Sequence, residues 1–169
     1  MKRSQIYKPL RDQAIKGMPY LKFRDLQKNQ MHAPVQNYPI PLPAIFIEIG
    51  DIRFSNLLEH DQKGDSVISI YLYLDLVTDS FDGAEGENET INLLDRMDDV
   101  FQTFEGFAVP GMTPLVRLTE FKPQYGTRFI LYRVDFTTTV DSHKEQGGMF
   151  IPTPDPDIRS KVVNDFKFS

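Results

Sequence analysis

The sequence predicts an α+β domain in which an antiparallel or mixed β-sheet, built from two hairpins, is packed on one face by two helices. Two segments, 44–76 and 115–140, each contain a pair of runs in which apolar and polar residues alternate. A segment between them, 90–107, repeats apolar residues at helical spacing. With a further helix near the start, the order is helix, hairpin, helix, hairpin. This order favours a two-layer α+β domain over a parallel doubly wound sheet.

The first helix is expected at Tyr7–Met18. Pro9 stands near its first turn, where proline is tolerated, and Gly17 is a stop signal near its end. Its predicted buried side consists of Leu10, Ala14 and Ile15. A short strand is expected at Leu21–Gln27, and the following segment 31–43 holds four prolines, which predict an extended and rigid connection.

The first hairpin is expected to join Ala44–Ile49 to Val67–Leu76 through a polar turn at Gln62–Asp65. The break at Gly50 and Asp51 is typical of a β-bulge. One face of the second arm is wholly apolar and is predicted to be buried: Ile68, Ile70, Leu72, Leu74 and Leu76. The opposite face carries Val67, Ser69, Tyr71, Tyr73 and Asp75.

This second face has two interpretations, contact with water or contact with another protein surface. Tyrosine combines a large apolar ring with a polar hydroxyl group and is enriched where subunits meet. We therefore predict that Tyr71, Tyr73 and the neighbouring Asp75 lie on an interface with another subunit or partner.

The central helix is expected within the segment 90–107, with Asn88 or Thr90 as its N-cap and Gly106 after its end. Asp95, Arg96 and Asp99 would fall mostly outside the core. The apolar positions predicted to pack across the sheet are Ile91, Leu93, Leu94, Met97, Val100, Phe101 and Phe104.

The second hairpin is expected to join Leu115–Phe121 to Phe129–Val140 through a turn at Lys122–Thr127. Four residues of its second arm would share the buried face: Ile130, Tyr132, Val134 and Phe136.

A change in composition predicts a single domain over 1–144 and a Gly/Pro-rich C-terminal arm over 145–169. Gly147 and Gly148 favour a flexible exit, and the prolines that follow favour extended backbone. The arm is more apolar than typical disordered sequence, and its last residues alternate as in a strand that could add to a sheet edge. The interface residues predicted in it are Phe150, Val162, Phe166 and Phe168, and the alternatives for the arm are a disordered terminus and burial against its own subunit.

Composition excludes several classes of protein. The absence of cysteine excludes disulfides and thiolate metal sites. No apolar run approaches the roughly 20 residues that span a bilayer, so no membrane partner is expected. A net charge of −5 argues against broad contact with phosphate backbones, and no RNA-binding motif accompanies the aromatic residues of the strands. Sequence-specific nucleic-acid binding is therefore not expected.

The residues that could carry chemistry form no recognised constellation. The segment from Thr78 to Glu89 partly matches a calcium loop but lacks its first aspartate, and the three histidines have no ligand spacing. No hydrolase, phosphate-loop or dinucleotide-binding motif occurs. We therefore predict a protein that is not an enzyme and has no cofactor. A small-ligand or calcium-binding module is the alternative, followed by an enzyme that uses carboxylates scattered over loops.

The layout resembles that of the phage tail terminator or tail-completion family of virion proteins. The matching parts are PLRDQAIKG, YPIPLPAIFIEI, VISIYLYLDLVT, INLLDRMDDVFQTF, LVRLTEF and FILYRVDFTTTV. The resemblance covers about residues 7–140 and depends on the order of elements, because the family has no signature motif or catalytic residues to transfer. The long Pro-rich connection and the C-terminal arm depart from the family pattern.

This resemblance implies a structural protein that forms a ring, commonly a hexamer, at the end of the tail tube. The ring would join the tube to neck or connector proteins. The protein would be made in the host cytoplasm and would reside in the tail or neck of the virion. In this setting, the Tyr71 and Tyr73 face would contact a neighbouring subunit or the tail tube.

Overall fold

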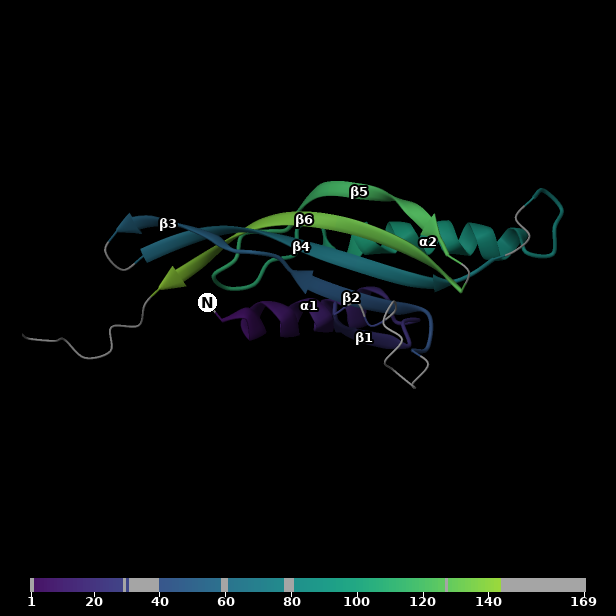
Figure 1. Ribbon diagram of the computed structural model, residues 1–169, viewed down its shortest axis with the longest axis horizontal. Helices are drawn as coiled ribbons and strands as arrows, with labels where there is room; N and C mark the ends of the chain where they lie inside the picture. Colours follow the sequence, from purple (N-terminus) through teal and green to yellow (C-terminus); the bar gives the residue numbers. More distant parts are fainter. Residues whose placement is uncertain are drawn as a thin grey trace, which may run out of the picture.

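The computed structural model describes residues 2–28, 30, 40–58, 61–77, 81–126 and 128–143. Within these residues the chain forms two helices and a six-stranded mixed sheet, which confirms the predicted α+β class (Figure 1). In chain order, the elements are α1 (Arg3–Gly17), β1 (Phe23–Leu26), β2 (Ala44–Ile49), β3 (Arg53–Leu58), β4 (Asp61–Asp75), α2 (Glu87–Phe104), β5 (Val116–Tyr125) and β6 (Phe129–His143).

The sheet is built around the long strands β4 and β6. The strand order is β1-β2-β4-β6-β5, and β3 also pairs with β4. The β1–β2 pair is parallel, whereas the other pairs are antiparallel. The short strand predicted after the first helix is therefore present as β1, and its parallel pairing makes the sheet mixed.

The first predicted hairpin is longer than its sequence pattern indicated. Strands β2 and β3 follow one another along the same edge of β4, and the chain leaves strand geometry between them near Gly50, as expected. The Gly50 N–H still donates to the Val67 carbonyl at 2.9 Å. The predicted turn at Gln62–Asp65 is wrong, because these residues lie within β4. This part of β4 is largely exposed and carries polar side chains on both faces. Its sequence therefore resembles that of a turn.

Both helices cover the same face of the sheet, as predicted (Figure 1). Four alternating residues of β4 and four of β6 project into the layer between sheet and helices. From β4 they are Ile68, Ile70, Leu72 and Leu74, and from β6 they are Ile130, Tyr132, Val134 and Phe136. Leu76, expected to continue the β4 series, is 38% exposed because it lies beyond the end of the strand.

Helix α1 begins earlier than predicted, and the set of residues that it buries also differs from the prediction. It starts at Arg3, and the side chain of Gln5 accepts a hydrogen bond from the Lys2 N–H at 2.7 Å. Pro9 consequently lies inside the helix rather than in its first turn. Ile15 is 46% exposed, so its predicted burial is wrong. The extra helical turn supplies Ile6, and the buried positions become Ile6, Leu10 and Ala14.

Helix α2 also differs from its prediction at two apolar positions. Its N-cap is Gly86 rather than Asn88 or Thr90, whereas Gly106 follows its end with a φ of 73°, as expected for a glycine stop. Ile91 and Leu94 are 50% and 54% exposed, although both were expected to be buried. The residues that α2 buries are Leu93, Met97, Val100, Thr103 and Phe104.

The two helices touch through a close contact between Gly17 and Thr103. The Gln13 side-chain amide donates to the Thr103 carbonyl at 2.9 Å, and a Cβ atom at position 17 would overlap the Thr103 side chain. The glycine at the end of α1, expected only as a stop signal, therefore also permits the two helices to approach each other.

Candidate interaction surfaces

The sheet face opposite the helices is divided into an apolar region and a polar region. Tyr73 belongs to the apolar region and is fully buried within the chain. Its ring packs edge-on against Phe46, at 5.3 Å between centroids, and against Phe129, at 5.0 Å. This corrects the expectation that the Tyr73 ring points away from the core, because the second face has a small core of its own. The residues of this cluster are Ala44, Phe46 and Tyr73, flanked by Phe23, Ile40, Leu42, Tyr71, Phe129 and Leu131.

Tyr71 lies in the polar region and remains partly exposed. The register places it beside Arg133 of β6, which in turn pairs with Phe121 of β5. The Arg133 guanidinium carbon is 5.2 Å from the Tyr71 ring centroid and 4.5 Å from that of Phe121. These distances are typical of cation–π contacts, so Arg133 of β6 connects two aromatic rings, one from each of the neighbouring strands β4 and β5.

Hydrogen bonds fix the positions of this row. Arg133 donates to both carboxylate oxygens of Asp135 at 2.8 Å, the bidentate geometry of a strong ion pair. The Tyr71 hydroxyl donates to Glu48 Oε2 at 2.6 Å. We name Glu48, Tyr71, Phe121, Arg133 and Asp135 the polar row. Its side chains are already oriented by one another, and they offer a partner a partly exposed and preorganised surface.

The environment of Tyr71 raises its pKa to about 12, first through burial and then through the hydrogen bond to Glu48. Its phenol is therefore neutral at every physiological pH. The folded pKa is above the unfolded value, so the stabilisation is fully present below about pH 10 and is lost as the pH rises towards 12.

We expect the Tyr71 ring resonance, identified by its loss in Tyr71→Phe, to titrate with a midpoint near 12 in an NMR pH series. In Glu48→Gln the midpoint should move down, because an amide does not repel the phenolate. A midpoint near 10 in the unmodified protein would show that the ring is neither partly buried nor bonded to Glu48.

The remaining predicted interface residues are distributed differently. Asp75 is exposed at the end of β4, where it pairs with Phe129. The predictions for Phe150, Val162, Phe166 and Phe168 fall outside the described residues. Among the predicted positions of β4, Tyr71 and Asp75 are thus the two that retain exposed surface.

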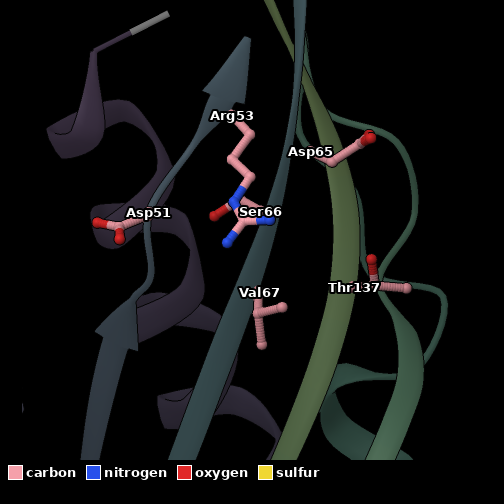
Figure 2. Close-up of a pocket in the computed structure, with 6 residues that line it drawn as sticks. All are labelled: Asp51, Arg53, Asp65, Ser66, Val67 and Thr137. Carbon is pink, nitrogen blue, oxygen red and sulfur yellow. The ribbon is translucent and has the colours of Figure 1, made fainter.

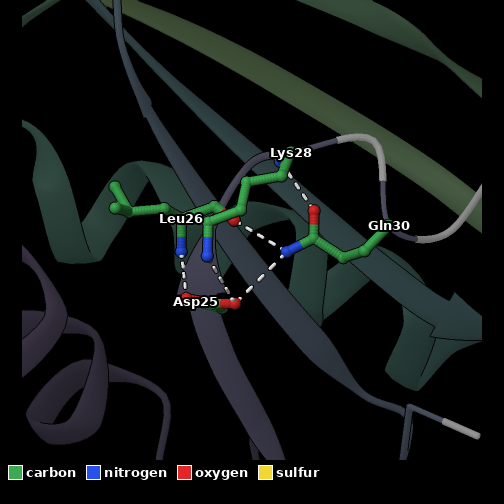
Figure 3. Close-up of polar contacts among 4 residues, drawn as sticks. All are labelled: Asp25, Leu26, Lys28 and Gln30. Atoms are coloured by element: carbon green, nitrogen blue, oxygen red, sulfur yellow. Dashed lines mark hydrogen bonds and ion pairs between the residues drawn. The ribbon is translucent and has the colours of Figure 1, made fainter. Parts of the chain in front are cut away.

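At the outer edge of the sheet, side chains pair with the backbone groups of Leu26 in β1. Gln27 donates its N–H towards β2, to the Ile47 carbonyl, so the N–H of the preceding Leu26 points to the outer edge. Asp25 accepts that N–H at 2.7 Å, and Gln30 donates to the Leu26 carbonyl at 2.7 Å (Figure 3). Because these groups are already paired, the Leu26 backbone is not available to another strand.

The opposite edge of the sheet is β5, and the backbone of this strand is free to pair with another strand over only part of its length. Nearly every residue of β5 is exposed. At its start, Glu105 Oε2 accepts the Arg117 N–H at 2.8 Å, and near its end Pro123 lacks an N–H to donate. The strand also has two irregularities in its pairing with β6. Large apolar side chains are nevertheless exposed along it: Val116, Leu118, Phe121 and Tyr125.

Two surface hollows lie at other parts of the sheet. The first, of about 410 Å³, is lined by Asp51, Arg53, Asp65, Ser66, Val67 and Thr137. Figure 2 shows Arg53 extending along β4, with Asp51 on one side and Asp65 on the other. The second, of about 480 Å³, lies between the start of α1 and strands β1 and β2. Both combine charged and apolar side chains.

The described part of the chain contains no set of side chains that could bind calcium as the alternative function would require. Among those residues, no group of three or more histidine, aspartate or glutamate side chains is arranged to hold a metal ion. Thr78 and Ser80 of the partial calcium loop lie outside the described ranges. Glu87, near the end of that loop, instead accepts the Gly83 N–H at 2.9 Å.

In the same described ranges, neither helix has the length and apolar character needed to cross a membrane.

Comparison with known proteins supplies no family for this chain. No protein-family model matches, and no curated protein matches. One solved structure without a functional name is similar over 85% of this chain and 95% of its own, with 13% sequence identity and a TM-score of 0.39. A similarity at this level carries no argument about function.

The polar row was missed by sequence reasoning, apart from Tyr71. Arg133 and Asp135 are two residues apart in a strand and therefore share a face, which is a signal that the sequence does contain. The position of Arg133 beside Tyr71 and Phe121 depends on the register between three strands. The hydrophobic pattern fixes the face that each side chain occupies, but a shift by two residues keeps that face and changes the cross-strand partner.

Proposed function

We propose that this chain is a structural assembly protein of a phage or prophage tail. It forms a homo-oligomeric ring that terminates the tail tube and joins it to the neck or connector proteins. It acts through protein surfaces rather than catalysis. Its place is in the tail or neck of the virion.

The observation that supports this proposal is the number of large apolar side chains left exposed on regular elements. Leu118 is 57% exposed and Tyr125 67% on β5, while Ile91 and Leu94 are at least half exposed on α2. Strand and helix surfaces of this kind are typical of protein–protein contact sites. The order of elements, which the resemblance to tail terminators depends on, also agrees with the fold.

The proposal is tested by electron microscopy of the purified protein, alone and mixed with tail tubes of the phage or prophage that encodes it. We expect rings of uniform size, free or on the tubes, and one ring at a tube end. The calcium alternative is tested in the same samples by measuring the melting temperature with and without calcium. A monomer that ignores the tubes and is stabilised by calcium would contradict the proposal.

A further inference from the structure

The outward side of α2 combines exposed apolar and acidic side chains. Ile91, Leu94, Asp95 and Asp98 follow the spacing i, i+3, i+4, i+7 and therefore share one stripe of the helix. All four are exposed. The opposite side of α2 holds the buried residues, so this stripe points away from the sheet. We name these four residues the α2 stripe.

The outward side of α1 has the same spacing with the opposite charge. Lys8, Arg11, Asp12 and Ile15 also follow i, i+3, i+4, i+7, and Ile15 is 46% exposed. Arg11 pairs with the adjacent Asp12 at 2.9 Å, but both side chains remain about half exposed, at 42% and 55%. We name these four residues the α1 stripe. Over their full lengths, α1 carries four basic residues and one acidic residue, whereas α2 carries five acidic residues and one basic residue.

These charges are not neutralised by the contact between the two helices of one chain. That contact uses Gly17 and Thr103, near the C-terminal ends of both helices, and the helices extend from it towards opposite ends of the molecule (Figure 1). Within the described residues, neither Lys8 nor Asp98 forms an ion pair. The two stripes are therefore separate, exposed and of opposite charge on the same molecule.

We propose that the α2 stripe of one copy packs antiparallel on the α1 stripe of a second copy. In that orientation, Ile91 meets Ile15, Asp95 meets Arg11 and Asp98 meets Lys8. The two stripes have the same length, because Ile91 and Asp98 are seven residues apart, as are Lys8 and Ile15. This spacing corresponds to about 10 Å along each helix. The antiparallel direction places Ile91 against Ile15 and both aspartates of the α2 stripe against basic residues, with Leu94 opposite Asp12, whereas the parallel direction would place Asp95 against Asp12.

This contact specifies the partner surface of the proposed assembly function and rests on it. The two stripes differ, so a contact repeated from copy to copy forms a ring where the rotation between copies closes and an open filament where it does not, whereas a contact made reciprocally by two copies gives a two-fold dimer. The charge pairs select the orientation and the partner, and the apolar side chains of the stripes lose contact with water.

Charge exchange between the stripes tests the contact. The first variant, Lys8→Glu/Arg11→Glu, makes the α1 stripe acidic, and the second, Asp95→Lys/Asp98→Lys, makes the α2 stripe basic. Each variant alone should self-associate about tenfold more weakly than the unmodified chain in sedimentation velocity, with or without tail tubes. An equimolar mixture should recover association, because every remaining contact again joins opposite charges.

Glu85→Lys/Glu89→Lys is the matched control for the second variant, since it makes the same change in net charge as Asp95→Lys/Asp98→Lys at exposed positions outside the stripe. It should associate like the unmodified chain. If the unmodified chain forms rings and both stripe variants do so equally well, the contact is wrong and the assembly function stands. If the unmodified chain associates neither alone nor on tubes, both proposals fail. Weakened variants that the mixture does not rescue would also overturn the pairing.

Discussion

Replacing Tyr73 with alanine is expected to lower the free energy of unfolding by about 3 to 5 kcal/mol, as for other fully buried aromatic side chains. The ring is 0% exposed and packs edge-on between Phe46 and Phe129. Its removal leaves a cavity beneath the second face of the sheet. The measurement is urea denaturation followed by circular dichroism, with the slope of the transition compared between variants.

Tyr71→Ala is the matched control for this experiment. Tyr71 lies two residues away on the same face of β4 but is partly exposed, so its replacement should cost clearly less stability. Tyr73→Phe should retain most of the stability, because it keeps the ring that packs between Phe46 and Phe129. Equal losses for Tyr71→Ala and Tyr73→Ala would contradict the buried position of Tyr73.

Replacing Gly17 with alanine is expected to destabilise the protein by about 1 to 3 kcal/mol through overpacking. The new Cβ would overlap the Oγ1, Cγ2 and Cβ atoms of Thr103, so rotation of the threonine side chain alone cannot relieve the contact. The two helices must move apart. Alanine is favoured over glycine within helices by up to about 1 kcal/mol, so any net loss measured by urea denaturation reports the overlap.

A double-mutant cycle separates this overlap from other effects. Thr103→Ala removes two of the three overlapping atoms, and Gly17→Ala should cost much less in that background than in the unmodified chain. If the cost of Gly17→Ala is the same in both backgrounds, the helices do not meet at this pair of residues.

The hydrophobic pattern was sufficient to predict most of the helix-facing core. The alternating apolar residues of β4 and β6 project into that core because one face of each strand is buried along most of its length. The pattern did not reveal that the opposite face also buries Tyr73. An aromatic ring in a strand is compatible with either environment, and Phe46 and Phe129 come from strands distant in sequence.

The errors on the helices have a related cause. Ile91 and Leu94 fit helical periodicity, but the apolar residues of α2 cover more of its circumference than the sheet can contact. Periodicity identifies a helix and does not state which apolar positions are covered. Ile15 on α1 is the same case. All three exposed side chains lie on the sides of the helices that point away from the sheet.

The most direct test of the proposed assembly role is to locate the protein in purified particles. Antibodies raised against the purified chain, with gold labels, are applied to phage particles or isolated tails and imaged by electron microscopy. The proposed function predicts label at the head-proximal end of each tail and the protein's peptides in a mass spectrum of the same particles. Particles that contain no trace of the chain, with the protein found only free in the host lysate, would contradict it.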